Sequence, residues 1–225
     1  MSDSLNNIAV IYRGMYARLR PRPSNFFQIK ENNEKFFLNE IGNCDVFCET
    51  NSFDETNDNE LRKCMNWKHI NFNNSNRSCM DSVMNSLKIY DFTQYEFIFN
   101  IRFGLQFNKP LSMFNIDNDK FNCLWKEPHR LNSNGNTRIS DHLFAFPTKY
   151  LNNFNNINLD DESISYGSGK MIKPADKAHH IMHYLNLDIE NEVNFMVEGE
   201  HWSGGRDCDP VGRSYIEVNR GKMIQ

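Results

Sequence analysis

The chain has 225 residues, 39% of them hydrophobic and 13% aromatic, which is enough to build one domain with a full core or two small ones. Its net charge of −4 argues against a general nucleic-acid-binding protein, and no apolar run approaches the roughly 20 residues that span a bilayer. The N-terminus lacks the pattern of a signal peptide and the six cysteines form no CxxC pair, so a cytoplasmic protein with free thiols is expected.

The first expected strand is the short apolar run Ile8–Tyr12, and Arg13-Gly14 follows it directly. A glycine after a buried strand permits a tight turn and close approach of the backbone to a ligand, while the arginine supplies positive charge. The pair therefore fits a nucleotide site or an ordinary structural turn. A basic, proline-containing loop comes next, and its arginines, beginning at Arg18, either lie over an anionic ligand or form a solvated edge.

Strands and helices then alternate up to the middle of the chain. The spacing of apolar residues predicts a helix from its N-cap Ser24 to about Asn39, a strand at Cys44–Glu49, a loop at Asn51–Asn59, a helix at Glu60–Trp67, an extended piece at Ile70–Phe72 and a helix at Asp81–Tyr90. Such alternation favours a mostly parallel sheet with right-handed crossovers.

The stretch from Tyr95 to Leu111 is expected to form the centre of the sheet. Its β-branched and aromatic run, Phe97 to Phe103, is typical of a strand that is covered on both faces. Arg102 interrupts this run, and a guanidinium is almost never fully buried without a partner. We expect Arg102 at the carboxyl end of the strand, where open α/β sheets bind ligands, with either a phosphate or a carboxylate as its partner.

The second half of the chain is expected to contain shorter elements between polar loops. These are a strand at Asn122–Trp125, an apolar run at Leu143–Phe146, a short helix opened by Pro147, a helix from Pro174 to Leu185 and strand-like segments after Val193. Asp141 and His142 precede the apolar run, where the carboxylate could accept a proton from an acceptor hydroxyl. An Asx turn or a helix cap explains the same pair.

Two further polar groups have the composition of metal sites. Among His179, His180 and His183, two could share one helix face as zinc ligands do, although a partly exposed face explains them too. The segment EGEHW, which contains His201, suits a divalent cation or a solvent-facing strand end. The chain contains no Walker A, GxGxxG or GxSxG motif.

The order of these pieces resembles small GT-A-type glycosyltransferases encoded by large DNA viruses. The resembling segments span most of the chain: the opening strand with Arg13-Gly14, the central IRFGLQFNKPL, the segment RISDHLFAFP, and EGEHW followed by a terminal strand. The resemblance implies an α/β fold with a GT-A-like (Rossmann-like), mostly parallel central sheet flanked by helices, in a single domain over residues 1–225. Its nucleotide-binding half would cover about 1–110 and its acceptor half about 111–225.

The resemblance also implies a nucleoside-diphosphate-sugar donor, a glycan or protein acceptor, and a location in the host cytosol if the protein is viral. Asp141 would be the general base, His142 would lie on the acceptor side, and His201 would help to hold Mn²⁺ or Mg²⁺. The residues that would bind the donor are Arg13, Gly14, Arg18, Asn100, Arg102, Gly104 and Gln106.

Gly104 departs from the family pattern, which has an aspartate of a DxD-like metal site after Arg-Phe. Either neighbours such as Asn100 and Gln106 then hold the metal, or the basic side chains neutralise the diphosphate without one. Two alternatives to a glycosyltransferase follow from these observations. One is a non-catalytic relative that binds a glycan or a partner protein, and the other is a metal-dependent hydrolase that uses the histidines of AHHIMHYL.

Overall fold

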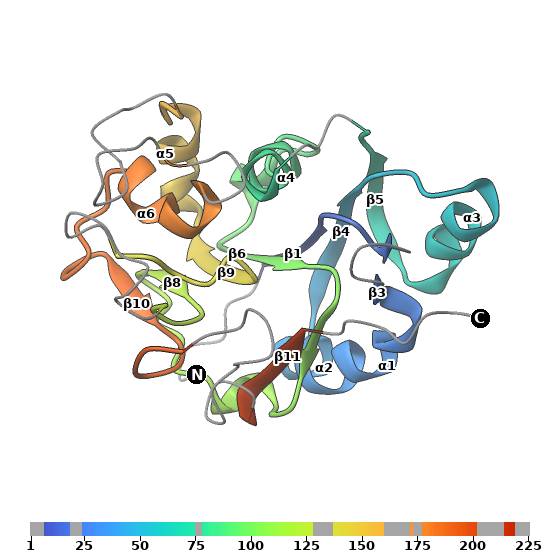
Figure 1. Cartoon of the computed structure of the whole chain (residues 1–225), viewed down its shortest axis with the longest axis horizontal. Helices are drawn as coiled ribbons and strands as arrows, with labels where there is room; N and C mark the ends of the chain where they lie inside the picture. The colour runs from blue at the N-terminus through green and yellow to red at the C-terminus, as the bar shows by residue number, and fades with distance from the viewer. Residues whose placement is uncertain are drawn as a thin grey trace.

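A seven-stranded sheet with the strand order β10-β8-β9-β6-β1-β4-β5 forms the centre of the molecule (Figure 1). The structure is a computed structural model that describes residues 7–18, 24–74, 78–127, 137–159, 172, 177–201 and 214–218. Strand β9 runs antiparallel to both of its neighbours, and the other four pairs in the sheet are parallel. The prediction of a mostly parallel α/β sheet is therefore confirmed.

The strands of this sheet come from both predicted halves of the chain. They are β1 (Ile8–Arg13), β4 (Cys44–Thr50), β5 (Trp67–Phe72), β6 (Phe97–Arg102), β8 (Phe121–Cys123), β9 (Leu143–Pro147) and β10 (Val193–Phe195). Two small sheets accompany it, one of β2 (Ala17–Arg18) with β3 (Ser24–Asn25) and one of β7 (Leu105–Phe107) with β11 (Ile216–Val218).

Short helices cover both faces of the central sheet (Figure 1). The α-helices are α1 (Lys30–Asn33), α2 (Asn39–Ile41), α3 (Glu55–Cys64), α4 (Cys79–Ser86), α5 (Leu151–Asn155) and α6 (Ile181–Tyr184). A π-helical stretch (Glu34–Leu38) joins α1 to α2, and 3₁₀ turns occur at Phe26–Gln28, Phe92–Gln94, Leu111–Met113, Thr148–Tyr150 and Lys177–His180. None of the described helices is long and apolar enough to cross a membrane.

Side-chain alternation along β1 and β6 divides the core into two clusters, one on each face of the sheet. Tyr12 and Phe99 pack with Phe37 of the α1–α2 segment on one face, whereas Ile11 and Ile98 belong to the cluster under α4, α5 and α6. Successive residues of a strand point to opposite faces. Arg13 lies two residues after Ile11, and Arg102 lies four residues after Ile98. Both arginine side chains therefore lie on the α4 face.

Several predicted boundaries are wrong for local reasons. Ser24 is not an N-cap but part of β3. The predicted loop Asn51–Asn59 contains the start of α3, because the Asp54 side chain accepts a hydrogen bond from the Asn57 backbone and caps the helix. Trp67 opens β5 instead of ending a helix, and its ring packs edge-on against Tyr12 of the core.

Other expectations are confirmed or lie outside the described residues. Helix α4 begins two residues earlier than predicted because Ser78 and Asp81 form a capping box. Pro147 is followed by helical turns as predicted, and the five described cysteines are free thiols. The basic loop after Arg18, the beginning of the predicted helix at Pro174 and the glycine-rich segment after His201 lie outside the described residues.

Candidate functional site

The candidate site lies where the order of strands along the sheet reverses. From β1 the chain extends the sheet through β4 and β5 on one side, and β6 then pairs with the other side of β1. Arg13 and Arg102 are register partners at the carboxyl ends of β1 and β6. Open α/β sheets bind ligands outside the carboxyl ends of their strands at such a point. The predicted position of Arg102 at the end of the central strand is confirmed.

Arg13 is held rigidly inside the protein. Its side chain is 1% exposed, its Nε donates a hydrogen bond to Oδ1 of Asn100, and its Nη2 donates to the backbone carbonyl of Asp141. The guanidinium also lies 5.5 Å from the centre of the Phe144 ring. Burial lowers the pKa of Arg13 to about 10, which leaves it positively charged at neutral pH. Nη1 has no hydrogen-bond partner among the described residues.

Arg102 forms an ion pair with Asp141. Its Nη1 lies 3.0 Å from Oδ1 and 3.1 Å from Oδ2 of a carboxylate that is completely buried. Burial alone would raise the pKa of Asp141, but the positive charge of Arg102, with smaller contributions from His179 and other neighbours, holds it well below its usual range. The Arg102 side chain is 28% exposed. Of the two arginines, Arg102 is therefore the one that reaches solvent.

Asn100 fixes the direction of the Arg13 side chain. Its Nδ2 donates to Oγ of Ser86 over 2.8 Å, and that hydroxyl donates in turn to the carbonyl of Val83 in α4. The amide oxygen of Asn100 consequently faces Nε of Arg13. The described contacts of Asn100 position Arg13, and its predicted role in donor binding stays a prediction.

Gly14 turns the chain away from the end of β1. Its φ is +88°, a conformation that costs other residues about 1 kcal/mol or more, and its amide donates to the carbonyl of Glu49 over 3.1 Å. A Cβ added at this position would lie 3.7 Å from Oγ of Ser82. That hydroxyl is buried and has no hydrogen-bond partner among the described residues. The backbone at Gly14 thus lies close to α4 beside the Arg13 side chain.

His142 lies on the other side of Asp141 and is neutral. Its Nδ1 is 2.8 Å from Oγ of Ser140 and 3.7 Å from Oδ1 of Asp141. Burial lowers the pKa of His142 to about 3, and the charge of Arg102 acts in the same direction against the opposing effect of Asp141. The predicted acceptor-side residue is thus brought next to the predicted base.

A chain of charged side chains continues beyond Asp141. Nε2 of His179 lies 3.9 Å from Oδ1 of Asp141, and Nδ1 of the same ring lies 3.4 Å from Oε1 of Glu127. Glu127 also forms an ion pair with Arg138. The sequence suggested for His179 a metal ligand or a partly exposed helix face, and it gave no indication of a role for Glu127 or Arg138. No local motif could have revealed these contacts, because the residues come from separate segments.

Comparison with known proteins identifies the fold. Neither a protein-family model nor a curated protein matches the sequence. The structure of 4-diphosphocytidyl-2C-methyl-D-erythritol synthase from Anaerococcus prevotii DSM 20548, a nucleotidyltransferase, is similar with a TM-score of 0.54 at 12% identity, over 87% of this chain and 90% of that one. An active-site mutant of the glycosyltransferase LgtC has a TM-score of 0.50 at 9% identity, over 97% and 84%.

Both structures have Rossmann-like folds of the GT-A type. At identities this low the similarity concerns the fold alone, and it confirms the fold class that the sequence predicts.

Four of the predicted site residues are not joined to the two arginines by any described contact. Gly104 lies in the turn between β6 and β7 with φ of +87°, and Gln106 is paired in register with Glu217 of β11. Arg18 is in β2, and only its backbone is described. Nε2 of His201 lies 2.6 Å from the backbone carbonyl of Glu198, so this nitrogen carries a proton and is not free to bind a metal ion. Their predicted roles stay predictions.

The histidine cluster does not supply a set of metal ligands. The rings of His180 and His183 are 6.3 Å apart on one face, as predicted, but His183 contacts the backbone carbonyl of Thr137 and His179 faces Asp141. Among the described residues, no group of three or more His, Cys, Asp or Glu side chains could hold a metal ion. The hydrolase hypothesis therefore has no described metal site to support it.

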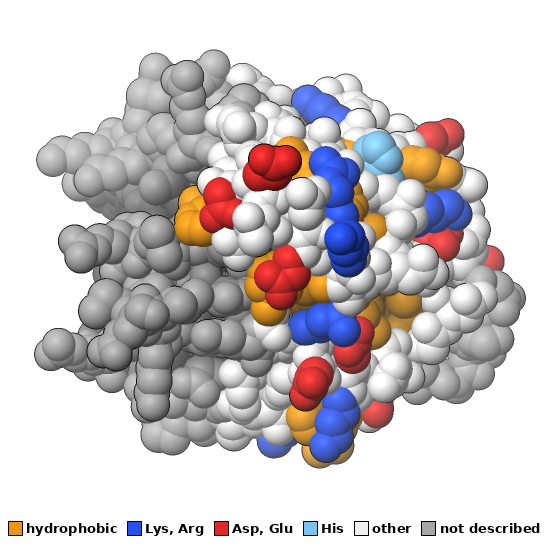
Figure 2. Space-filling model, turned by 90° about the vertical axis from the view of Figure 1, so that its right-hand side faces the viewer, with side chains coloured by type: hydrophobic (Ala, Val, Ile, Leu, Met, Phe, Trp, Pro, Cys, Tyr) orange, Lys and Arg blue, Asp and Glu red, His pale blue; other side chains and the backbone are white. Residues whose placement is uncertain are grey.

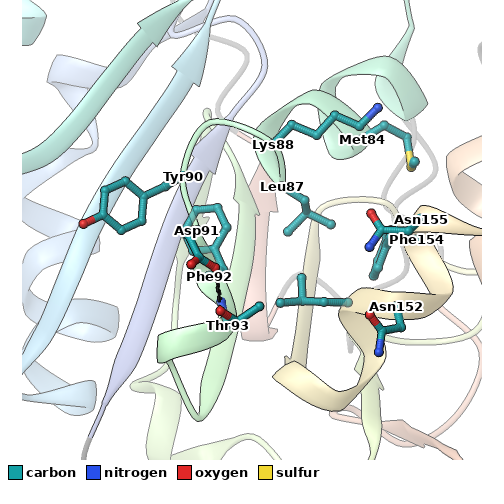
Figure 3. A pocket seen from close by; sticks show the side chains of 11 residues that line it. Met84, Leu87, Lys88, Tyr90, Asp91, Phe92, Thr93, Asn152, Phe154 and Asn155 are labelled. Carbon is teal, nitrogen blue, oxygen red and sulfur yellow. Dashed lines mark hydrogen bonds between the residues drawn. The ribbon is translucent and has the colours of Figure 1, made fainter.

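A cavity of about 140 Å³ lies away from the arginines, between the end of α4, the turn at Phe92–Gln94 and α5 (Figure 3). Leu87, Leu151 and Phe154 form apolar walls, and the Asp91 side chain that borders it accepts a hydrogen bond from Thr93. Because the Phe92–Gln94 turn precedes β6, this cavity is at the opposite end of that strand from Arg102.

The surface formed by α3 and β5 has mixed charge. Figure 2 shows acidic and basic side chains interspersed on this side of the molecule, where α3 alone contributes Glu60, Arg62 and Lys63. Neighbouring charges of opposite sign largely cancel at a distance in salt solution. At the strand ends, in contrast, Arg102 pairs with the Asp141 carboxylate and Arg13 donates to the backbone carbonyl of the same residue.

Proposed function

We propose that this protein is a glycosyltransferase that moves a sugar from a nucleoside-diphosphate-sugar donor to a glycan or protein acceptor. The observation that carries the proposal is the pairing of Arg13 with Arg102 at the carboxyl ends of β1 and β6, where the strand order reverses. This is the position at which open α/β sheets bind nucleotides. The GT-A-type fold, which is shared with a nucleotidyltransferase and a glycosyltransferase, supports a nucleotide-containing donor.

The two arginine side chains at the strand ends are candidate partners for a ligand with several negative charges. Arg102 pairs with the Asp141 carboxylate, whereas Arg13 donates to the backbone carbonyl of Asp141 and is acted on by the charges of both Asp141 and the buried Glu49. A leaving nucleoside diphosphate carries about two to three negative charges that a catalyst must stabilise. Guanidinium groups match phosphate oxygens in geometry as well as in charge.

The proposal gives the two arginines different tasks. Arg102, which reaches solvent, contacts the diphosphate, and the buried Arg13 supplies a fixed positive charge behind it. Gly14 allows the nucleotide to approach the backbone at the end of β1.

Asp141 and His142 are proposed to lie on the acceptor side, with Asp141 as the candidate general base, a role that would favour inversion at the sugar carbon. The lowered pKa of Asp141 makes it a weak base, so its first task is that of a counter-ion that orients Arg102.

The described side chains at the strand ends do not fit a divalent metal site. Gly104 offers no side-chain oxygen, Asp141 is occupied by Arg102, and Nε2 of His201 donates to a backbone carbonyl. A Mn²⁺ or Mg²⁺ ion prefers several oxygen ligands. We therefore assign neutralisation of the diphosphate to Arg13 and Arg102 and derive no step through a metal ion.

A thermal-shift panel tests the proposal. The protein is heated with UDP-, GDP- and dTDP-sugars, each with and without Mn²⁺, and matched nucleoside triphosphates are included as a control for a nucleotidyl donor. A donor at 100 times its dissociation constant stabilises the folded protein by about 2.7 kcal/mol. Arg102→Met should abolish this stabilisation. The matched variant Arg62→Met removes an arginine that stacks on Phe72 of β5, and it should retain the full shift.

Three outcomes of these experiments distinguish a glycosyltransferase from the alternatives. Stabilisation by one class of nucleotide sugar that depends on Arg102, followed by release of the nucleoside diphosphate when acceptors are added, supports the glycosyltransferase. Binding without release supports the non-catalytic alternative. If no nucleotide sugar stabilises the protein under either metal condition, the proposal is wrong.

A further inference from the structure

The protonation of His179 can be deduced from its hydrogen-bond partners. Its Nδ1 lies 2.7 Å from the backbone carbonyl of Ile139 and 3.4 Å from a carboxylate oxygen of Glu127. Both of these oxygens accept hydrogen bonds, and a carbonyl oxygen can do nothing else, so Nδ1 must carry a proton. The nitrogen that gains or loses a proton is therefore Nε2, which lies 3.9 Å from Oδ1 of Asp141.

Neutral His179 would direct the lone pair of Nε2 toward a carboxylate, and protonated His179 directs an N–H group toward it. The second arrangement is favoured electrostatically. In agreement with this geometry, the charges of Asp141 and Glu127 raise the pKa of His179 even though burial acts in the opposite direction.

The other ionisable groups around His179 leave this conclusion unchanged. Arg138 lowers the pKa of His179, but it is paired with Glu127. His142, which also faces Asp141, is neutral. Helix α4 packs against the segment that holds His179, and the charge of Asp141, together with burial, raises the pKa of the Cys79 thiol in α4 to about 11, so this group is uncharged.

Two more groups near this segment are held by their own contacts. The Asp81 carboxylate belongs to the capping box at the start of α4, and Lys177 donates to the carbonyl of Leu159. His180 and His183 face each other.

We propose that His179 is a positioning residue that controls anion binding at the strand ends. A proton on its Nε2 weakens the hold of the Asp141 carboxylate on Arg102, and loss of this proton strengthens it. This inference rests on the proposed function, because it assumes that an anion binds at Arg102. When His179 is protonated, it shares Asp141 with Arg102 and adds a positive charge near the anion. When it loses this proton, Asp141 acts on Arg102 alone and repels the ligand more strongly.

The expected consequence is donor affinity that decreases as the pH rises through the pKa of His179. Thermodynamic linkage requires the reciprocal effect, so a bound anion must raise the pKa of His179. Each unit by which the anion raises this pKa corresponds to a tenfold difference in anion affinity between the protonated and the neutral protein.

The experiment follows the imidazole signals of the full-length protein by NMR from about pH 5.5 to about pH 8.5. The probes are sulfate, UDP-glucose and GDP-mannose, whose sulfate or diphosphate groups keep a constant charge over this range. His179→Asn assigns the signal of His179 by its absence. It also keeps an N–H donor for the Ile139 carbonyl while it removes the titrating nitrogen. His69→Asn, on the exposed part of β5, is the matched control.

The inference is supported if a probe raises the pKa of His179 in the wild type, if its affinity decreases several-fold across the titration, and if His179→Asn alone loses this dependence. It is overturned if the probe binds in a manner that requires Arg102 but shows the same pH dependence in wild type and His179→Asn, a result that leaves the proposed function intact. If none of the probes binds at any pH, the inference and the proposed function both fail.

Discussion

Replacing Asp141 by asparagine should destabilise the protein by about 3 kcal/mol. The carboxylate is completely buried, and Nη1 of Arg102 lies 3.0 Å from it. At an effective dielectric constant of about 20, two unit charges at this distance attract each other by about 5 kcal/mol. Removal of one partner from a buried ion pair typically costs about 3–5 kcal/mol. We expect the lower end because the Arg102 side chain is 28% exposed and can turn toward water.

Urea unfolding of wild type and Asp141→Asn measures this effect through the midpoint concentration at unchanged m-value. Asp119→Asn, at an exposed position, is the matched control and should stay within about 0.5 kcal/mol of wild type. The double variant Arg102→Met/Asp141→Asn should be more stable than the sum of the two single changes predicts, because it leaves neither member of this ion pair without its partner. A loss below about 1 kcal/mol for Asp141→Asn would refute the conclusion that this pair is shielded from water.

The same variant separates the two roles that are open to Asp141. If Asp141 serves as a counter-ion, Asp141→Asn leaves more positive charge at the strand ends and binds the nucleotide-sugar donor at least as tightly as wild type. If it is also the general base, sugar transfer falls by about 10²–10⁴-fold while donor binding is retained. Transfer at the wild-type rate with saturating donor would exclude the base.

Two further substitutions test individual features of the structure. Gly104→Asp should destabilise the folded protein by about 1–2 kcal/mol in urea unfolding, because φ at Gly104 is +87°. It should not confer Mn²⁺ binding in a titration. A variant as stable as wild type would contradict the left-handed conformation of this turn. His142 has a pKa of about 3 in the folded protein and about 6.5 when unfolded, so the unfolded chain takes up a proton first as the pH falls. The free energy of unfolding should therefore decrease between about pH 6.5 and about pH 3, and His142 contributes at most about 4–5 kcal/mol to this decrease. His142→Gln should make the decrease smaller. If the pH dependence is the same in wild type and His142→Gln, the ring is accessible to water in the folded protein.

The centre of the fold could be predicted because its strands are continuous apolar runs. β1 and β6 are buried on both faces, which leaves a strong local pattern, and a single arginine at the end of each run marks the edge of the sheet. The short helices could not be placed as well. The Asp54 cap of α3 is a recognisable signal, but the polar composition around it suggested a loop.

The partner of Arg102 could not be predicted because it depends on contacts between distant segments. A lone arginine at a strand end is equally compatible with a phosphate and with a carboxylate. The choice of Asp141 follows from the pairing of β9 with β6, in which Arg102 donates its backbone amide to the carbonyl of His142. The antiparallel direction of β9 leaves no local trace in its apolar sequence, and the approach of His179 to Asp141 depends on a further segment.

The carboxylate partner of Arg102 does not compete with a phosphate for the whole guanidinium. The described hydrogen bonds of the Arg102 side chain come from Nη1 alone, and those of Arg13 come from Nε and Nη2. Each guanidinium thus has N–H groups beyond those that hold it in place, and a guanidinium has five in total. A buried acid that fixes the direction of an arginine reduces the entropy that the arginine loses when a ligand binds. Asp141 can therefore stabilise the folded protein and orient Arg102 while it leaves N–H groups of Arg102 for an anion, although its own charge opposes that of the anion.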